Sequence, residues 1–401
     1  MSARVLGPML VSGLLLLFVF SGLLKWVPGL PLDPTLMFGS AVAACCALRL
    51  LAGSVPVGQA ATLVLATAIV FNAWYLLTAF FTVSTSFWTF KAATIVLNML
   101  ALVAPIVCLH TEWHFAWFDR FLWVMAGACM ALVFGFYLTG NIEFLIYQGF
   151  DKEVLKIPDY LVLASLIGLG TLSALARPTP WRVAFAIAGF AAMLVLTARG
   201  PLLFATVLVV LGGLVLRGRG RDARPGPLLV VLLLGVVAIA ALRWQGAEGA
   251  LTRFTGIFSD EAAFEGALRV GEFSVALDVI AQAPLVGVGL GGYGMAGYEM
   301  EENIYPHNLL LEAFAEAGVV GLVLFVAAMA VVVVSGWRAR HDPRVAGYFV
   351  LVLFLMLNYM KSGGFVGARD LYLFTGVLAA RLNLPRDWSL ALFGVPARRP
   401  G

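Results

Sequence analysis

The residues best suited to chemistry in this 401-residue chain are one histidine and two arginines. His307, one of four histidines, lies in the stretch 303–321 (NIYPHNLLLEAFAEAGVVG), where a long polar loop meets an apolar segment. An imidazole titrates near neutral pH and can therefore serve as a general base. We interpret His307 as such a base. The alternative is an interfacial histidine that is held by groups of the loop.

Arg199 and Arg269 are candidates for binding an anion. Arg199 lies in the turn T-A-R-G-P between two nearly continuous apolar segments, and Arg269 lies between Glu265 and Glu272 at helical spacing. A planar guanidinium can bind two phosphate oxygens at once, which a lysine cannot copy. We therefore expect both arginines to hold a phosphate group. The alternatives are a snorkelling side chain for Arg199 and a solvated salt bridge for Arg269.

Glu312 and Glu316 follow His307 at helical spacing. Like charges four residues apart repel, and carboxylates within an apolar segment are costly unless they face a cation or a polar interior. We expect them to orient His307 or to brace nearby arginines. Pro306 suits the first position of a helix, so His307 is expected in the first turn. Substrate-binding roles are predicted for Arg253, Arg369, Asn308, Tyr305, Glu312 and Glu316.

Composition defines the class of protein that must position these residues. The chain is 62% hydrophobic and 12% charged, with a mean hydropathy of +0.97, whereas a soluble domain is roughly half apolar and a quarter charged. The deficit of charge predicts an all-α polytopic membrane protein. The apolar run from Arg4 to Leu24 is longer than the apolar core of a signal peptide, so we expect it to be an uncleaved first span.

Apolar windows of about twenty residues predict about twelve transmembrane helices. The expected segments are 5–24, 34–52, 60–82, 91–110, 117–138, 159–177, 182–198, 200–217, 227–243, 306–335, 345–361 and 367–384. The chain then divides into transmembrane helices over 1–243, one large outer loop over 244–305, and further helices with a short tail over 306–401.

The distribution of positive charge predicts the orientation. The short loops RGRGRDAR and WRARHDPR are densely basic, and basic loops favour the cytoplasmic side. This places both termini in the cytoplasm and the large loop outside. Arg199, Arg253, Arg269 and Arg369 remain on the outer side, against the general bias. Their turns could surround His307, so we expect them to line one cavity.

The large outer loop contains a predicted helix over 261–283, followed by the glycine-rich stretch PLVGVGLGGYGMAGY. Gly287, Gly289 and Gly292 fit the pattern G-x-G-x-x-G but follow no parallel strand, so we expect a tight backbone turn and not a nucleotide site. The sequence contains no Walker motif, and its four cysteines have neither metal nor disulfide spacing. We expect no metal, no cofactor, no ATP and no nucleic-acid partner.

Three motifs together resemble the O-antigen ligase and O-antigen polymerase family. They are A-R-G-P at Arg199, then R-x-x-x-F from Arg269 with A-P-L-V-G-V-G-L-G-G-Y-G after it, and H-N-x-x-L-E-x-x-x-E-x-G-x-x-G from His307 to Gly321. The resemblance covers the chain from about residue 180 onward. It implies a glycosyltransferase of the GT-C class in the bacterial inner membrane, with its active site and its large helix-containing loop on the periplasmic side.

The resemblance also implies substrates and roles. The donor would be a glycan carried on undecaprenyl diphosphate and, for a ligase, the acceptor would be the lipid A core, with membrane lipids around both. His307 would take the proton of the acceptor hydroxyl, Arg199 and Arg269 would hold the diphosphate, and direct attack would invert the anomeric centre. We favour a ligase. A polymerase with the same donor is the alternative, and a lipid-linked glycan transporter, which would need spread intramembrane charges and internal repeats, is a remote one.

Overall fold

The structure is a computed structural model, and over the residues that it describes it consists of helices without strands. The described residues are 3–25, 32–53, 55–142, 145, 160–176, 178–215 and 260–384. This confirms the all-α class that composition predicts. The expected segment 227–243 lies outside the described residues.

In this part of the chain, six helices are long and apolar enough to cross a membrane. They are α2 (Pro34–Leu51), α3 continued by η2 (Gln59–Phe81), α4 (Phe87–Cys108), α5 (Glu112–Leu138), α14 (Leu309–Arg338) and α15 (Pro343–Ser362). Shorter apolar helices are α1 (Ala3–Val19), α7 (Tyr160–Leu175), α8 (Pro180–Val195) and α9 (Arg199–Val215). The multi-pass character is therefore present, while the number of about twelve spans stays a prediction.

An Asp-Pro pair begins two of these helices in the same way. The carboxylate of Asp33 accepts a hydrogen bond from the amide of Thr35 at 2.7 Å, and that of Asp342 accepts one from the amide of Arg344 at 2.9 Å. The proline that follows each aspartate lacks the N–H that the first turn would leave without a partner. The local sequence thus determines where α2 and α15 start.

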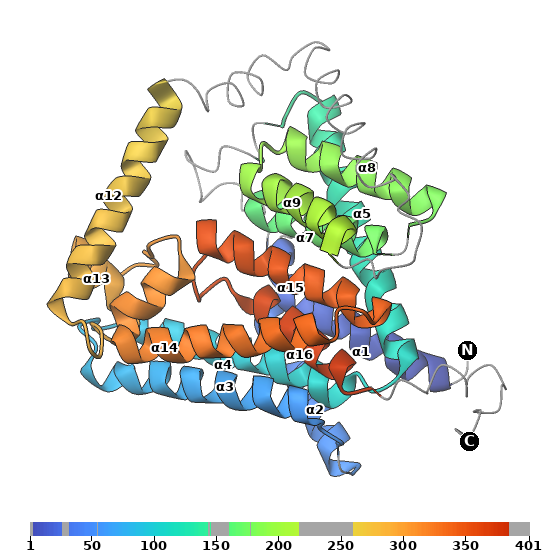
Figure 1. The fold of residues 1–401 in the computed structure, drawn as a ribbon, viewed down its shortest axis with the longest axis horizontal. Coiled ribbons are helices and arrows are strands. Elements are labelled where there is room, and N and C mark those ends of the chain that lie inside the picture. The colour runs from blue at the N-terminus through green and yellow to red at the C-terminus, as the bar shows by residue number, and fades with distance from the viewer. Residues whose placement is uncertain are drawn as a thin grey trace.

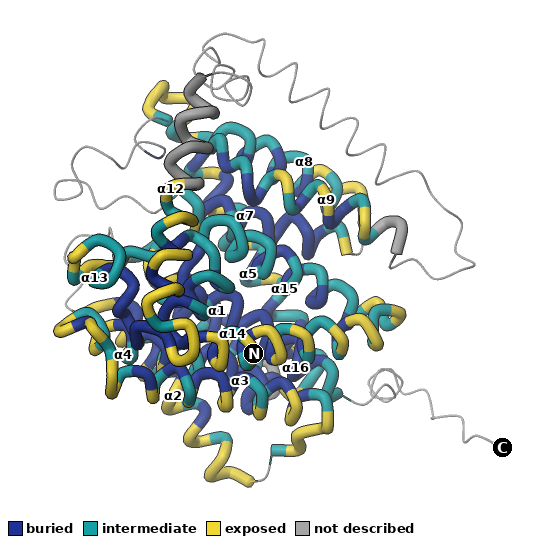
Figure 2. The backbone as a smooth tube through the Cα atoms, turned by 60° about the vertical axis from the view of Figure 1, so that its left-hand side comes forward, coloured by how far each residue is buried: buried dark blue, intermediate teal, exposed yellow. Residues whose placement is uncertain are grey.

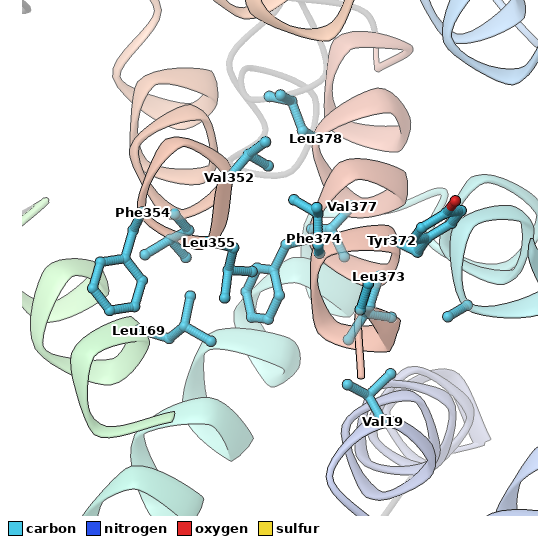
Figure 3. Close-up of a cluster of buried hydrophobic side chains, with 14 of the residues drawn as sticks. Val19, Leu169, Val352, Phe354, Leu355, Tyr372, Leu373, Phe374, Val377 and Leu378 are labelled. Carbon is cyan, nitrogen blue, oxygen red and sulfur yellow. The ribbon is translucent and has the colours of Figure 1, made fainter. Parts of the chain in front are cut away.

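The short helix α16 (Arg369–Leu382) lies at the centre of the bundle, and its residues from Asp370 to Arg381 are buried. It packs against α4, α15 and α3. Figure 3 shows Phe374 of α16 beside Leu355 of α15 in this core. A Cβ atom at Gly376 would lie 2.2 Å from the carbonyl oxygen of Leu102 in α4. The close backbone approach of α16 and α4 therefore requires glycine at this position.

The outward faces of the bundle are apolar. Figure 2 shows exposed residues on the outer sides of α2 and α3 and buried residues where the helices face the centre. The exposed side chains include Leu48, Phe80, Val124, Leu203 and Val323. Apolar surface of this extent is unfavourable in water and favourable against lipid tails. The pattern of burial therefore agrees with a membrane-embedded bundle.

The bundle has two polar ends. At the first, which we call the His307 end, α4 and α14 begin, α15 ends, and α12 (Asp260–Gln282) and α13 (Tyr293–Tyr298) pack nearby. Figure 1 shows α12 extending away from the bundle, with α13 at its base. At the opposite end, which we call the Glu112 end, α5 and α15 begin and α16 ends. The position of α12 matches the helix expected over 261–283.

Candidate active site

His307 lies in the loop before α14, and not in the first turn of the helix as Pro306 suggests. The helix begins at Leu309, and the side chain of Asn308 caps it by accepting hydrogen bonds from the amides of Leu310 at 2.9 Å and Leu311 at 3.2 Å. His307 itself has a φ of 52°, a left-handed conformation that is uncommon outside glycine. The side chain of His307 is 44% exposed.

Among the residues that the structure describes, the side chains of Glu272 and Tyr305 lie against the imidazole of His307. The Oε1 atom of Glu272 in α12 lies 3.7 Å from Nε2, and the ring of Tyr305 lies 4.6 Å from the imidazole, tilted by 55°. A separation of 3.7 Å is longer than a hydrogen bond, so the carboxylate lies next to the imidazole without a direct hydrogen bond to it. The sequence suggests Glu272 only as a partner of Arg269. Its contact with His307 arises because the loop that joins α12 to His307 folds back on the helix.

The end of α15 connects the loop of His307 with the turn of Arg199. On one side, the amide group of Asn308 donates a hydrogen bond to the carbonyl of Met360 at 2.8 Å. On the other, a Cβ atom at Gly200 would lie 3.3 Å from Nζ of Lys361. Arg199, the first residue of α9, therefore shares the His307 end of the bundle with Asn308. The structure thus brings two distant motifs to the same end of α15.

Of the other arginines expected at the site, the structure describes the positions of Arg269 and Arg369. The backbone of Arg269 lies in α12, three positions before Glu272, whereas Arg253 lies outside the described residues. Arg369 donates to the carbonyl of Phe18 at 3.2 Å and to the hydroxyl of Ser21 at 3.3 Å. These contacts direct its guanidinium toward the end of α1. A place for Arg369 in the cavity expected around His307 stays a prediction.

Glu312 and Glu316 are joined to Lys91, and not to His307 or to an arginine as expected. The Nζ atom of Lys91 lies 2.5 Å from Oε1 of Glu312 and 2.8 Å from Glu316, and all three side chains are 1% exposed. Buried charges are costly unless they are paired and fully hydrogen-bonded. We call this group the Lys91 cluster. Direct contact of the two glutamates with a substrate stays a prediction, and their burial does not favour it.

Neutral donors complete the Lys91 cluster. The hydroxyl of Tyr75 in α3 donates to Glu316 at 2.6 Å, and the amide of Gly291 donates to the same carboxylate at 3.0 Å. The amide of Phe365, in the turn between α15 and α16, donates to Glu312 at 2.9 Å. The cluster therefore joins α3, α4, α14, the glycine-rich loop and the α15–α16 turn directly beneath the loop of His307.

Lys91 is not among the expected site residues, because it falls at the edge of the span expected over 91–110. The helix begins one turn earlier, at Phe87, so that Lys91 lies inside α4. The signal was the combination of a lysine with the apolar, helix-compatible residues Phe87, Trp88 and Phe90 before it. A lysine inside an apolar helix indicates a buried acidic partner.

The glycine-rich loop replaces hydrogen bonds that α14 loses. Gly318 has a φ of 66° and a ψ of −169°, which breaks the helix inside its length. The carbonyls left free by this break accept hydrogen bonds from the loop, Ala315 from the amide of Val288 at 2.9 Å and Glu316 from the amide of Gly289 at 3.0 Å. Positive φ values at Gly287, Gly289 and Gly291 confirm the predicted tight turn.

Glu301, in the loop between α13 and α14, attaches that loop to the start of α4. Its carboxylate accepts hydrogen bonds from the amides of Phe87 at 3.0 Å and Thr85 at 2.6 Å, and from the hydroxyl of Ser84 at 2.8 Å. These donors, the Phe87 amide foremost, lower the pKa of Glu301 to about 2. The carboxylate therefore serves as an N-terminal cap for α4 that comes from a distant part of the chain.

Fold and site together define a multi-pass helical membrane protein whose polar site lies at one end of the bundle. Residues 183–326 match the family model of the O-antigen ligases. The matched region runs from α8 into α14 and contains Arg199, Arg269 and His307. It confirms the family resemblance that the three motifs carry. A search of curated proteins finds no match to the chain.

Proposed function

We propose that this protein is an O-antigen ligase that transfers a glycan from undecaprenyl diphosphate to the lipid A core oligosaccharide. The family match over residues 183–326 supports ligase- or polymerase-type chemistry. In this proposal the protein is a GT-C-type glycosyltransferase of the bacterial inner membrane, with cytoplasmic termini, and the His307 end faces the periplasm. The basic loop WRARHDPR, between α14 and α15 at the other end, supports this orientation.

The proposed reaction is a single displacement. His307 accepts the proton of an acceptor hydroxyl while the oxygen attacks the anomeric carbon of the donor sugar, and the bond from that carbon to the diphosphate oxygen breaks. The lipid diphosphate leaves with the electron pair, so that the anomeric configuration inverts. Arg199 and Arg269 stabilise the charge that develops on the diphosphate. The carried phosphate is itself the leaving group, and the proposal therefore requires neither ATP nor a metal.

The observation that carries this proposal is the contact of 3.7 Å between Glu272 and Nε2 of His307. A carboxylate at Nε2 stabilises the imidazolium that forms when Nδ1 takes a proton. The same helix, α12, carries Arg269 one turn before Glu272. This arrangement supports a site in which the base and a donor-binding arginine belong to one structural unit.

The other expected site residues take supporting roles in the proposal. Asn308 holds the loop of His307 through its cap and its bond to Met360, and Tyr305 packs on the imidazole. Glu312 and Glu316 act as positioning residues through the Lys91 cluster. Additional contacts of Arg253 and Arg369 with the donor remain predictions.

The test is transfer of a defined undecaprenyl-diphosphate glycan to lipid A core by purified protein, with and without chelator. His307→Ala should lower the rate by about 10²- to 10⁴-fold, the usual contribution of a general base. His341→Ala, the same change in an exposed residue of the loop between α14 and α15, is the matched control. Transfer by His307→Ala at the rate of the control would exclude His307 as the base.

A polymerase with the same donor would share this site, and the family match includes both activities. The two differ in the intermediate that accumulates when the gene is deleted. Long glycans on undecaprenyl diphosphate would support the ligase, and single repeat units would support the polymerase. A transporter would leave glycan transfer by the purified protein absent under all conditions.

A further inference from the structure

A second polar cavity lies at the Glu112 end of the bundle. It has a volume of about 110 Å³ and lies between α5, α8, α15 and α16. Its charged lining residues are Glu112, Asp119, Arg182, Arg344 and Arg381. Three arginines thus face two carboxylates, which leaves one positive charge in excess.

This cavity is separate from the site of His307. The helix α15 carries Arg344 in its first turn and Met360, which is bonded to Asn308, near its last residue. A helix of 20 residues is about 30 Å long. The two polar regions therefore lie at opposite ends of the bundle, and the inference below does not depend on the proposed glycosyltransferase activity.

One carboxylate oxygen serves two arginines in this cavity. The Oε1 atom of Glu112 accepts from Nη1 of Arg344 at 3.1 Å and from Nη2 of Arg381 at 2.9 Å. The Arg381 side chain is only 4% exposed, and its Nη1 atom has no hydrogen-bond partner among the described residues. Asp119 accepts from the hydroxyl of Tyr348 at 2.8 Å. A buried guanidinium nitrogen without an acceptor is unusual, because its desolvation is costly.

Two aromatic rings beside the cavity hold guanidinium groups in place by stacking. Arg381 lies 4.8 Å from the ring of Phe115, and Arg182 lies 4.5 Å from the ring of Trp123. Stacking of this kind fixes the plane of a guanidinium and leaves its edge for hydrogen bonds. Glu112 and Arg344 are each 28% exposed, so the cavity is accessible from the surface beside them.

We propose that this cavity is a phosphate-binding site, in which Arg381 and Arg344 hold an anionic phosphate group. The volume is several times the roughly 10–15 Å³ that one water needs, so the cavity can admit a phosphate group. Arg381 lines the cavity and keeps its Nη1 atom without an acceptor among the described residues, and Arg344 supplies a second guanidinium group at the rim. Basic pockets between membrane helices bind phospholipid headgroups, and a free phosphate ion has the same chemistry.

Glu112 competes with such an anion for both guanidinium groups. Removing the charge of Glu112 should therefore strengthen anion binding, whereas removing the charge of an arginine should weaken it. The Tm of the full-length protein in detergent micelles is measured at increasing concentrations of inorganic phosphate. In a second series, the micelles contain phosphatidylglycerol in place of phosphatidylcholine. A ligand that binds only the folded state raises Tm by an amount that grows with the logarithm of its concentration relative to Kd, so that a series of concentrations gives an apparent Kd. Glu112→Gln should lower this apparent Kd up to about fivefold, since it removes a competing partner of modest worth.

The arginine variants complete the test. Arg381→Gln and the more exposed Arg344→Gln should raise the apparent Kd for the anion at least about tenfold, the loss expected for a charged hydrogen bond. Arg338→Gln, an exposed arginine at the same end of the bundle, should leave it unchanged. A response to phosphatidylglycerol alone assigns a lipid headgroup, and a response to inorganic phosphate as well assigns the free ion. No response of the unaltered protein to either probe, or equal responses in Arg344→Gln and Arg338→Gln, would overturn the proposal.

Discussion

The amide of Val319 donates a hydrogen bond to the carbonyl of Pro284 at 2.9 Å. In an unbroken helix this amide would donate to Ala315, whose carbonyl accepts from Val288 instead. The helix α14 and the glycine-rich loop therefore exchange hydrogen bonds at the break in the helix. The motifs around Gly287 and Gly318 are two halves of one structure, which explains why both occur in this chain.

Gly318→Ala should destabilise the protein by about 1–3 kcal/mol or more, the cost of forcing a side chain into a backbone conformation reserved for glycine. The added Cβ would also lie 2.2 Å from the carbonyl oxygen of Leu285. Thermal unfolding in detergent measures the effect. Gly135→Ala, in an open position within α5, is the control and should be neutral or slightly stabilising. Equal Tm values for the two variants would contradict the assigned role of Gly318.

Lys91→Met should cost about 3–5 kcal/mol, because it leaves two buried carboxylates without their cation. The triple variant Lys91→Met, Glu312→Gln, Glu316→Gln removes all three charges and should recover much of that loss. Comparison of the two Tm values separates the cost of unpaired charge from the cost of lost packing. A single variant as stable as the unaltered protein would show that the Lys91 cluster is not needed for the fold.

Glu301→Gln should destabilise the protein at neutral pH and have less effect in acid. The pKa of Glu301 in the folded protein is about 2, below its ordinary value of 4.5, so its contribution to stability is fully present above about pH 4.5 and is lost as the pH falls toward 2. Unfolding is compared at pH 7 and pH 3, with Glu302→Gln, an exposed neighbour, as the control. If the stabilities of Glu301→Gln and Glu302→Gln differed by the same amount at pH 7 and at pH 3, this assignment would be contradicted.

Glu272→Gln should lower kcat for glycan transfer by about tenfold or more, since the imidazolium of His307 would lose its anionic neighbour. The dependence on donor and acceptor concentration should change little, because Glu272 acts through His307 as a positioning residue. Asp278→Asn, an exposed carboxylate on the same helix, is the control. A change confined to KM would instead indicate that Glu272 contacts a substrate.

Arg199→Gln and Arg269→Gln should each raise the donor concentration needed for half-maximal rate by about tenfold or more, the loss of one charged hydrogen bond. Saturating acceptor should not restore the rate, because the arginines are proposed to bind the diphosphate. Initial rates over a range of donor concentrations measure the effect, with Arg338→Gln as the control. Donor dependence equal to that of the control would remove both arginines from the site.

The fold class and most helices could be predicted from the sequence, because lipid requires long apolar helices whatever their partners are. Helix boundaries were less accurate where a cap decides them. Asn308 has a side chain that can bond to the first amides of α14, and this outweighs the preference of Pro306 for the first turn. In α4, residues 87–90 extend the helix by one turn and so bury Lys91.

The pairings within the site could be predicted only in part. Arg199, Arg269 and His307 stand out in the sequence by residue type and surroundings, and the family match includes all three. The partner of Glu312 could not be inferred, since Lys91 lies 221 residues away and no local spacing relates the two. The contact between Glu272 and His307 likewise depends on how the loop folds, which the sequence pattern does not specify.

The break in α14 at Gly318 also has a mechanical consequence. The turns before the break carry Asn308 and Glu312 and share hydrogen bonds with the glycine-rich loop. The Lys91 cluster fixes the same turns to α3 and α4. The loop is therefore braced from two sides, by the interrupted backbone of α14 and by buried charges, so that a large glycan at the His307 end would meet a rigid support.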